Sequence, residues 1–465
     1  WVPDWGQRRI HAMVSARPDW CLSRQRLWGV PIIAFHCGDC GEVNVNADWI
    51  DHVAAQFDAQ NSDVWYAQEA SDLLPKGAAC SACESSDLRK DGDILDVWFD
   101  SGVSYVANGF DQAPVDLYLE GSDQHRGWFH TSLLASVATR DRAPYRAALT
   151  HGFVVDGRGH KLSKSKKNFT PVHQVIEKSG AELIRLWAAS ADYREDIRVS
   201  DEILKRTADS YRKLRNTLRF LLGNLAGFDP ARDAVSDDQL RPLDRVILAD
   251  VDAFVARMDE AYSRYQFHQA MQAVSEFCAA LSAGYLDIAK DRLYCDPIDT
   301  PNRRAIQTVL QRVIEALIGV IAPVMPFTAE DAYDHLPGAH PESVTLSSFP
   351  QSGLNPAPPE IVEAGLTLWA VKERIATELE AFRRAKHHTY EARVSVPVRE
   401  IEARSLALFG DDLAELLLVG AVEFCPADGA VQIVAMEQAG CHRCWRPDPL
   451  DDEGLCTRCQ CAVEG

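Results

Sequence analysis

Long apolar runs and an excess of positive charge are both missing from this sequence of 465 residues. A membrane-spanning helix needs about 20 apolar residues in a row, and no stretch approaches that length, which argues against a membrane partner. Lys and Arg number 48 against 68 Asp and Glu, and a net charge of −20 excludes a chain-wide attraction to nucleic acid. Binding to a polyanion would therefore need a local basic patch.

The sequence also lacks an initiator methionine and an apolar signal peptide over its first 17 residues. Because domains average about 150 residues, the length predicts several of them. Hydrophobic residues make up 46% and charged residues 25%, which excludes a wholly disordered chain. We expect a multidomain cytoplasmic protein that is an excerpt of a longer chain.

The 13 cysteines are spaced for metal binding, because eight of them form four CxxC pairs. The first set is Cys37, Cys40, Cys80 and Cys83, and the second set is Cys441, Cys444, Cys456 and Cys459. The short spacer of the second set is close to that of a zinc ribbon. Four thiolates close a tetrahedral Zn²⁺ site and leave no position for a substrate, so both metals would be structural. Reduced thiols without a metal are the alternative.

The order of apolar residues predicts an α/β part over residues 1–200. Short strand-like runs, among them 115–119 and 149–155, alternate there with helical stretches and Gly-containing turns. Residues 35–93 carry the first cysteine set and a polar spacer. This pattern predicts a small insertion whose ends are held together by a bound metal ion.

The remainder predicts a helical bundle over residues 201–350. The apolar stripe from Met271 to Ile288 recurs at helical spacing and predicts a single helix. After the proline-rich segment 355–359, we expect an α+β junction over residues 360–436 and a zinc ribbon over residues 437–465.

A loop rich in glycine and lysine follows a predicted strand at residues 157–167. Its lysines could follow the charge of a phosphate chain during phosphoryl or adenylyl transfer, and its glycines permit unusual backbone angles. A solvated basic surface loop would have the same composition.

A second candidate site lies where a strand ends at Glu120. In an open α/β sheet the ligand crevice lies at the carboxyl ends of the strands, so Glu120 would face it. Asp123 and Gln124 could then bind ribose hydroxyls or an amine. The alternative is that Ser122 or Asp123 only caps a helix.

A local basic cluster does occur, on a helical stretch in which Asp209 is the only acid between the first and last cation. Such a helix could follow a phosphate backbone, and a solvated face is the alternative. The six cations are Lys205, Arg206, Arg212, Lys213, Arg215 and Arg219.

Together these segments resemble the class I aminoacyl-tRNA synthetases, most closely those for isoleucine, over nearly the whole chain. Lys161-Leu162-Ser163-Lys164-Ser165 resembles the KMSKS loop of the family, with Leu in place of Met. Residues 20–29, 96–102 and 120–129 are similar to isoleucine-type signatures. Residues 324–330 resemble a bundle signature shared with the valine and leucine enzymes.

The resemblance implies activation of L-isoleucine by ATP with Mg²⁺, and then transfer of the amino acid to isoleucine tRNA. Lys164, helped by Lys161, would stabilise the pyrophosphate leaving group in the transition state. The resemblance also implies that the basic helix opens an anticodon-binding bundle and that the ribbon lies against tRNA.

The resemblance assigns further residues to the adenylate and to the amino acid. Glu120 would contact the adenylate, and Gly121, Asp123 and Gln124 would line its ribose side. Trp98 and Trp128 would wall the amino-acid pocket, because large flat apolar surfaces suit a branched aliphatic group.

One signature of the family is missing, since no HxGH occurs in the sequence. The threonine-rich editing domain is also missing, and residues 1–6 match the segment just after it. We therefore expect a C-terminal part that is inactive alone and needs the N-terminal part, covalently or in trans, to form a monomeric enzyme. Valine specificity and a non-catalytic tRNA-binding module are the alternatives.

Overall fold

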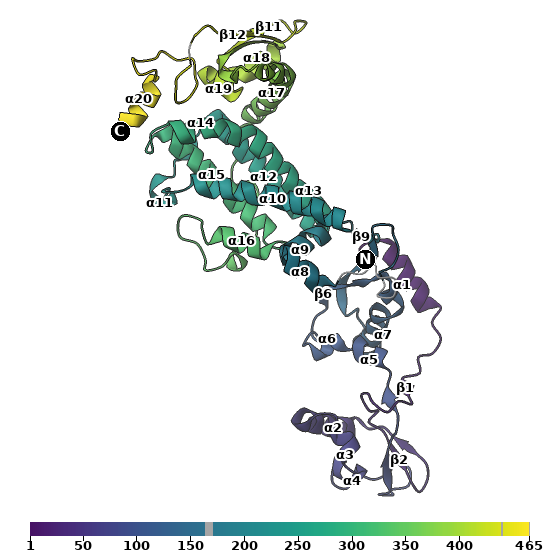
Figure 1. Ribbon diagram of the computed structural model, residues 1–465. Helices are drawn as coiled ribbons and strands as arrows, with labels where there is room; N and C mark the ends of the chain where they lie inside the picture. Colours follow the sequence, from purple (N-terminus) through teal and green to yellow (C-terminus); the bar gives the residue numbers. More distant parts are fainter. Residues whose placement is uncertain (163–170, 439, 465) are drawn as a thin grey trace. The chain divides into compact units, whose positions relative to one another are not determined.

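The computed structural model describes residues 1–162, 171–438 and 440–464. Two compact units are present: the first holds Trp1–Val155 with Tyr193–Ile197, and the second holds the described residues of Asp156–Asp192 and Arg198–Gly465 (Figure 1). The expected catalytic domain, residues 1–200, thus contributes the described residues of its segments 156–192 and 198–200 to the second unit. The other expected domain limits stay predictions. Within the described residues, no helix combines the length and apolarity needed to cross a bilayer.

A parallel pair of strands lies at the centre of the first unit. β6 (Val115–Gly121) and β7 (Tyr145–His151) are joined by α7 (Trp128–Arg140), because parallel strands require a crossover. Tyr118, Phe129 and Tyr145 form the buried contact in this region.

The strand run predicted over residues 149–155 is wrong in one respect, because it forms two strands. β7 ends at His151, and β8 (Val154–Asp156) begins after two intervening residues. A Cβ atom on Gly152 would lie 2.3 Å from the carbonyl oxygen of Glu195, so this backbone approach requires glycine at the break.

The insertion has a small core of its own. Its sheet has the order β3 (Val43–Asn44), β2 (Phe35–Cys37), β4 (Leu88–Lys90) and is antiparallel. Phe35, Val53, Trp65 and Leu73 are almost fully buried beside it. The first cysteine set is carried by this scaffold.

Long helices dominate the second unit. The four longest of the bundle, which lie side by side, are α10 (Asp201–Asn224), α12 (Pro242–Ser263), α13 (Phe267–Leu281) and α15 (Pro301–Ile321) (Figure 1). The stripe predicted as one helix instead runs through α13, a π-helical turn at Ser282–Leu286 and α14 (Asp287–Cys295). A π-helical turn adds a residue to the turn without ending the rod, which is why the apolar spacing survives it.

The junction region contains a mixed sheet and a long helix. α17 (Pro359–Arg384) begins at the last residue of the proline-rich segment, where proline suits the first helical turn. β10 (Ala392–Pro397) lies at the centre, parallel to β11 (Ala421–Cys425) and antiparallel to β12 (Gln432–Ala435). Residues 394–398 and 431–434, where apolar and polar residues alternate in the sequence, overlap β10 and β12.

The remaining helices and strands are short or peripheral. They are α1 (Trp5–Ser15), β1 (Ser23–Arg24), α2 (Ala47–Gln60), α3 (Val64–Ala67), α4 (Ala70–Leu73), β5 (Ile94–Leu95), α5 (Val97–Gly102), α6 (Ser104–Ala107), α8 (Val172–Ser179), α9 (Ala181–Ser190), β9 (Ile197–Val199), α11 (Pro230–Asp233), α16 (Pro326–Tyr333), α18 (Glu400–Leu406), α19 (Leu413–Leu416) and α20 (Thr457–Glu464).

Candidate active site, metal sites and RNA-binding helix

Two side chains meet at the carboxyl edge of the parallel strands. The β6–β7 register places Glu120 opposite Thr150 and Gly121 opposite His151. Glu120 Oε2 lies 3.8 Å from His151 Nε2 and accepts the N–H of Gly121 at 2.9 Å. His151 Nδ1 donates to the Gly152 carbonyl oxygen at 2.7 Å, which fixes the ring. Glu120 keeps half of its side chain exposed, so it can accept a hydrogen bond from a ligand.

His151 was missed by the sequence analysis. It is the last residue of the strand that follows Glu120 in the sheet, and the carboxyl ends of parallel strands share one edge. The position of His151 at the carboxyl end of β7 was therefore the signal that could have identified it.

The turn after β6 holds the other predicted adenylate residues. Gln124 Oε1 accepts the N–H of Trp128 at the start of α7, at 3.0 Å, and Gln124 Nε2 donates to Asp123 Oδ2 at 2.8 Å. A Cβ atom on Gly121 would lie 2.7 Å from Asp123 Oδ1, so a larger residue at this position would displace the Asp123 carboxylate. The alternative that Ser122 or Asp123 caps a helix is not seen, since no side chain caps the described turn that begins at Ser122, and Gln124 binds the first N–H of α7.

Trp98 and Trp128 are both close to Gly127, since Trp128 follows it in the chain and the Trp98 ring approaches it in the fold. The indole of Trp128 stacks on Tyr118 at 4.0 Å between centroids, and its Nε1 donates to the Ser101 carbonyl oxygen at 3.0 Å. The ring of Trp98 lies 2.8 Å from the Cβ position of Gly127 and is 43% exposed. One tryptophan is therefore fixed by hydrogen bonds and the other is open to a ligand.

The lysine-rich loop begins in the second unit. Asp156 accepts the N–H of Gly159, where φ of +85° suits glycine, and donates its own N–H to the carbonyl oxygen of His160 at 2.9 Å. Lys161 follows this turn and is exposed. Ser163, Lys164 and Ser165 lie outside the described residues.

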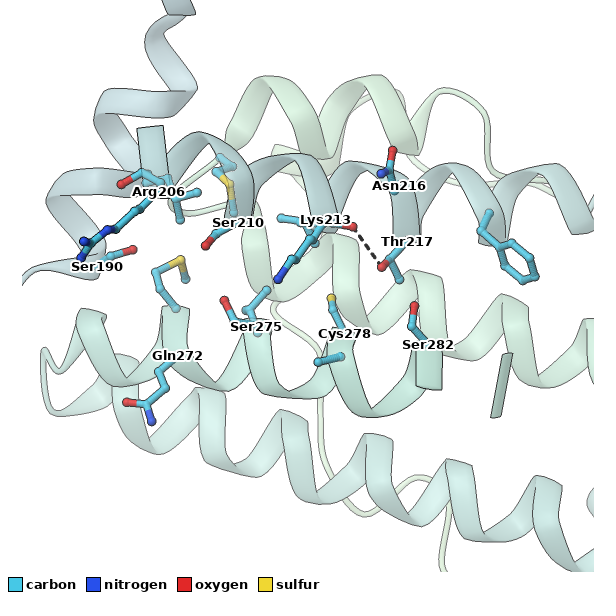
Figure 2. A pocket seen from close by; sticks show the side chains of 18 of the residues that line it. Ser190, Arg206, Ser210, Lys213, Asn216, Thr217, Gln272, Ser275, Cys278 and Ser282 are labelled. Atoms are coloured by element: carbon cyan, nitrogen blue, oxygen red, sulfur yellow. Dashed lines mark hydrogen bonds between the residues drawn. The ribbon is translucent and has the colours of Figure 1, made fainter. Parts of the chain in front are cut away.

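The six cations of α10 point in more than one direction. Arg206 and Lys213 line a cavity of about 1100 Å³ bordered by α9, α10 and α13, and Figure 2 shows Lys213 directed toward Ser275 and Cys278. Arg215 instead lies 3.9 Å from Asp331 of α16. Successive residues of a helix are about 100° apart around its axis, so the cations of one basic stretch lie on several faces of α10.

Acidic neighbours pair with two further cations of α10. Arg206 forms an ion pair with Glu202, and Arg212 lies 2.8 Å from Asp209. Within the described part of the chain, no ion pair is found for Lys205, Lys213 or Arg219. These three are the cations of α10 most readily available to a phosphate.

The first cysteine set converges on one point. Its four Sγ atoms lie within 4.8 Å of one another, and Cys37–Cys83 and Cys40–Cys80 are each 3.6 Å apart. Zn–S bonds of about 2.3 Å give tetrahedral S···S edges of about 3.8 Å, so the set fits this metal. The N–H of Ala82 bonds Cys80 Sγ at 3.4 Å and lowers the pKa of that thiol to about 6. A thiolate is the form that binds metal.

The second cysteine set has the same geometry and is fully buried. Its Sγ atoms also lie within 4.8 Å of one another, with Cys444–Cys456 at 3.6 Å. Burial by itself would raise the pKa of Cys441, but N–H groups, first that of Cys444, outweigh burial and lower this pKa to about 6. Both sets could therefore hold a metal ion.

Two family profiles match the chain. Residues 1–200 match the family described as tRNA synthetases class I (I, L, M and V), and residues 244–396 match the anticodon-binding domain of tRNA ligase. Residues 1–200 are thus a class I tRNA synthetase domain, and residues 244–396 an anticodon-binding domain. The class I catalytic fold and the helical anticodon-binding domain expected from the sequence are thereby confirmed.

The curated relatives most similar to this chain include several isoleucine–tRNA ligases. The chain is 46% identical to the protein of that name from Syntrophotalea carbinolica and 43% identical to that from Geobacter sulfurreducens. The alignments cover 99% and 100% of this chain and 52% and 53% of those relatives, so the chain spans about half of their length.

A solved structure shares the fold at low identity. The ternary complex LeuRS-tRNA-LeuAMS of Agrobacterium radiobacter K84 has a TM-score of 0.56 with 19% identity. The structural match covers 74% of this chain and 43% of the LeuRS chain. At this low identity it supports the class I fold and nothing further.

Proposed function

We propose that this chain is the C-terminal part of an isoleucine–tRNA ligase, which joins L-isoleucine to isoleucine tRNA at the expense of ATP with Mg²⁺. The observation that carries this proposal is the 46% identity to the Syntrophotalea relative over 99% of the chain. The remaining half, with its HxGH segment, would come from the N-terminal part. The complete enzyme is proposed to be a cytoplasmic monomer.

Glu120 is proposed to hold the adenylate at the sheet edge. Its carboxylate is fixed by the Gly121 N–H and lies beside His151, which leaves an acceptor for an amine or a ribose hydroxyl. Asp123 and Gln124 brace each other, so they present polar atoms at fixed positions next to it. Such fixed donors and acceptors lower the cost of reorganisation during the reaction.

The proposed amino-acid pocket uses the two tryptophans. The fixed ring of Trp128 would serve as its wall, and the exposed ring of Trp98 would close over a branched aliphatic side chain. Contact with flat apolar surfaces favours isoleucine through the area that it buries.

Lys161 and Lys164 are proposed to stabilise the pyrophosphate leaving group. Negative charge moves onto the β-phosphate as the bond to the α-phosphate breaks, and a flexible ammonium group can follow it. Because this interaction strengthens in the transition state, its loss should reduce kcat more than it raises KM for ATP.

The second unit is proposed to bind isoleucine tRNA, with Lys205, Lys213 and Arg219 on α10 contacting phosphates. Both cysteine sets are proposed to hold Zn²⁺, and a closed four-thiolate ion supplies structural cross-linking. The segment around the second set, residues 437–465, is proposed to be the expected zinc ribbon.

Pyrophosphate exchange with ATP tests the proposal. The chain is assayed alone and then mixed with a polypeptide that supplies the HxGH half, with isoleucine or valine as the amino acid. We expect isoleucine-dependent exchange only in the mixture, and its loss in Lys164→Ala.

Each other outcome selects a different conclusion. Activity of the chain alone would contradict the divided ATP site, and a preference for valine would change the substrate. No exchange in the mixture, with tRNA binding intact, would favour a non-catalytic tRNA-binding module.

A further inference from the structure

The C-terminal module, defined as residues 440–464, has almost no apolar core. The buried residues of its cluster are the four cysteines of the second set and Cys295, which comes from the end of α14. Leu450 and Leu455 are only partly buried against them. A segment this short and this poor in apolar contacts depends on a bound metal to fold.

One arginine of the module contacts both the cysteine cluster and the bundle. Arg443 donates to the carbonyl oxygens of Tyr294 at 3.0 Å and Cys295 at 2.5 Å. These carbonyls close α14 and have no partner within the helix. The same guanidinium lies 3.5 Å from Cys459 Sγ. A cation suits both contacts, because a helix C-terminus and a thiolate are both negative.

Asp291, one turn earlier on α14, is a second anchor. Arg458 donates to its two carboxylate oxygens at 2.8 and 3.1 Å, and Arg446 lies 3.0 Å from Oδ2. Only 7% of the Asp291 side chain is exposed. The carboxylate is therefore removed from water and depends on arginines supplied by the module.

The network continues into the junction region. Arg446 lies 2.8 Å from Glu415 Oε2 on α19, and Arg292 of α14 donates to both oxygens of the same carboxylate, at 2.5 and 2.7 Å. Glu415 is 6% exposed. The module is thus attached to α14 through charged hydrogen bonds of Arg443 and Arg458, and to α19 through the ion pair of Arg446 with Glu415.

We propose that the second cysteine set and these arginines form a metal-dependent clamp, in which metal binding and docking of the C-terminal module are thermodynamically linked. The metal holds the short segment that carries Arg443, Arg446 and Arg458 in position. Without it, Asp291 loses the arginines that compensate its carboxylate in the docked state. By reciprocity, docking strengthens metal binding by the factor by which metal strengthens docking, so a substitution of Asp291 that weakens docking also weakens metal binding. The clamp rests on the proposed zinc assignment and not on the aminoacylation reaction.

Competition with a chromogenic chelator tests the linkage, and the first cysteine set serves as an internal control. We expect two Zn²⁺ ions per chain. In Asp291→Asn one of them should lose roughly 10–100-fold in affinity, as metal sites do when an outer contact is removed, and the other should not change. Wild-type affinity at both sites would overturn the clamp.

Arg458→Gln removes the same contact from the side of the module, where the bundle core is untouched. It should weaken the same site, and circular dichroism would show that the helices remain. Arg404→Gln, which breaks the exposed pair with Glu400, is the matched control and should change neither affinity.

Limited proteolysis gives a readout that is independent of metal affinity. Stripping the metal from the wild-type chain should expose residues 440–464 to cleavage, and restoring Zn²⁺ should protect them. Protection that persists without metal would overturn the clamp. Failure of either site to bind Zn²⁺ would instead overturn the zinc assignment.

Discussion

The ring of Trp98 lies 2.8 Å from the place that a Cβ atom would occupy on Gly127. A methyl group there would also meet Gln124 Oε1 at 2.6 Å, so Gly127→Ala must displace one side chain or the other. Both belong to the proposed substrate site. A shift of about 1 Å at such a site can reduce the rate roughly 100-fold.

We expect Gly127→Ala in the complete enzyme to lower isoleucine-dependent pyrophosphate exchange by about that factor. Gly92→Ala is the matched control, because no atom lies within 4 Å of its Cβ position. Full activity in Gly127→Ala would show that Trp98 and Gln124 do not shape the site.

The free energy of unfolding should depend on a buried hydrogen bond in the bundle. Tyr285 donates to Asp244 Oδ1 at 2.8 Å, and both side chains are almost fully buried. Tyr285→Phe leaves the carboxylate without this donor and should cost roughly 1–3 kcal/mol in urea unfolding. Tyr294→Phe, at a position that is 58% exposed, should change stability by less than about 0.5 kcal/mol.

Acid should destabilise the second unit below about pH 4.5. Burial by itself would raise the pKa of Glu415, but Arg292 and then Arg446 outweigh it and lower this pKa to about 2. A carboxyl group whose folded pKa is depressed stabilises the fold fully above its unfolded pKa and loses that contribution as pH falls through the folded pKa.

The loss from Glu415 should therefore extend from about pH 4.5 to about pH 2, with a magnitude on the order of 3 kcal/mol. Urea unfolding at a series of pH values measures it, and Glu415→Gln should flatten the profile over this window. An unchanged profile in the variant would assign acid sensitivity to other carboxylates.

Binding of tRNA should distinguish the cations of α10. Lys213 borders the cavity and has no ion pair among the described residues, whereas Arg215 lies near Asp331. Lys213→Ala should weaken binding and reduce the slope of log affinity against log salt by about 1. Arg215→Ala should have a smaller effect. Equal effects of the two substitutions would indicate that the acid near Arg215 does not matter.

The sequence by itself determined the features that depend on neighbours in the chain. The CxxC spacing brings two thiols together within a single turn, and the class I motifs are contiguous segments. The apolar stripe of α13 and α14 and the strand ending at Glu120 are local as well. The π-helical turn at Ser282–Leu286 and the strand break at Gly152 were not predicted from the sequence. Each depends on local backbone geometry, which the spacing of apolar residues does not record.

Tertiary structure alone decided which distant side chains meet. Arg458 and Asp291 are 167 residues apart in the sequence and 2.8 Å apart in the fold. The pairing of Glu120 with His151 required the strand register, and the division of the α10 cations required the position of α16. Contacts of this kind arise from the packing of complete elements, whose order in space is not encoded in any one segment.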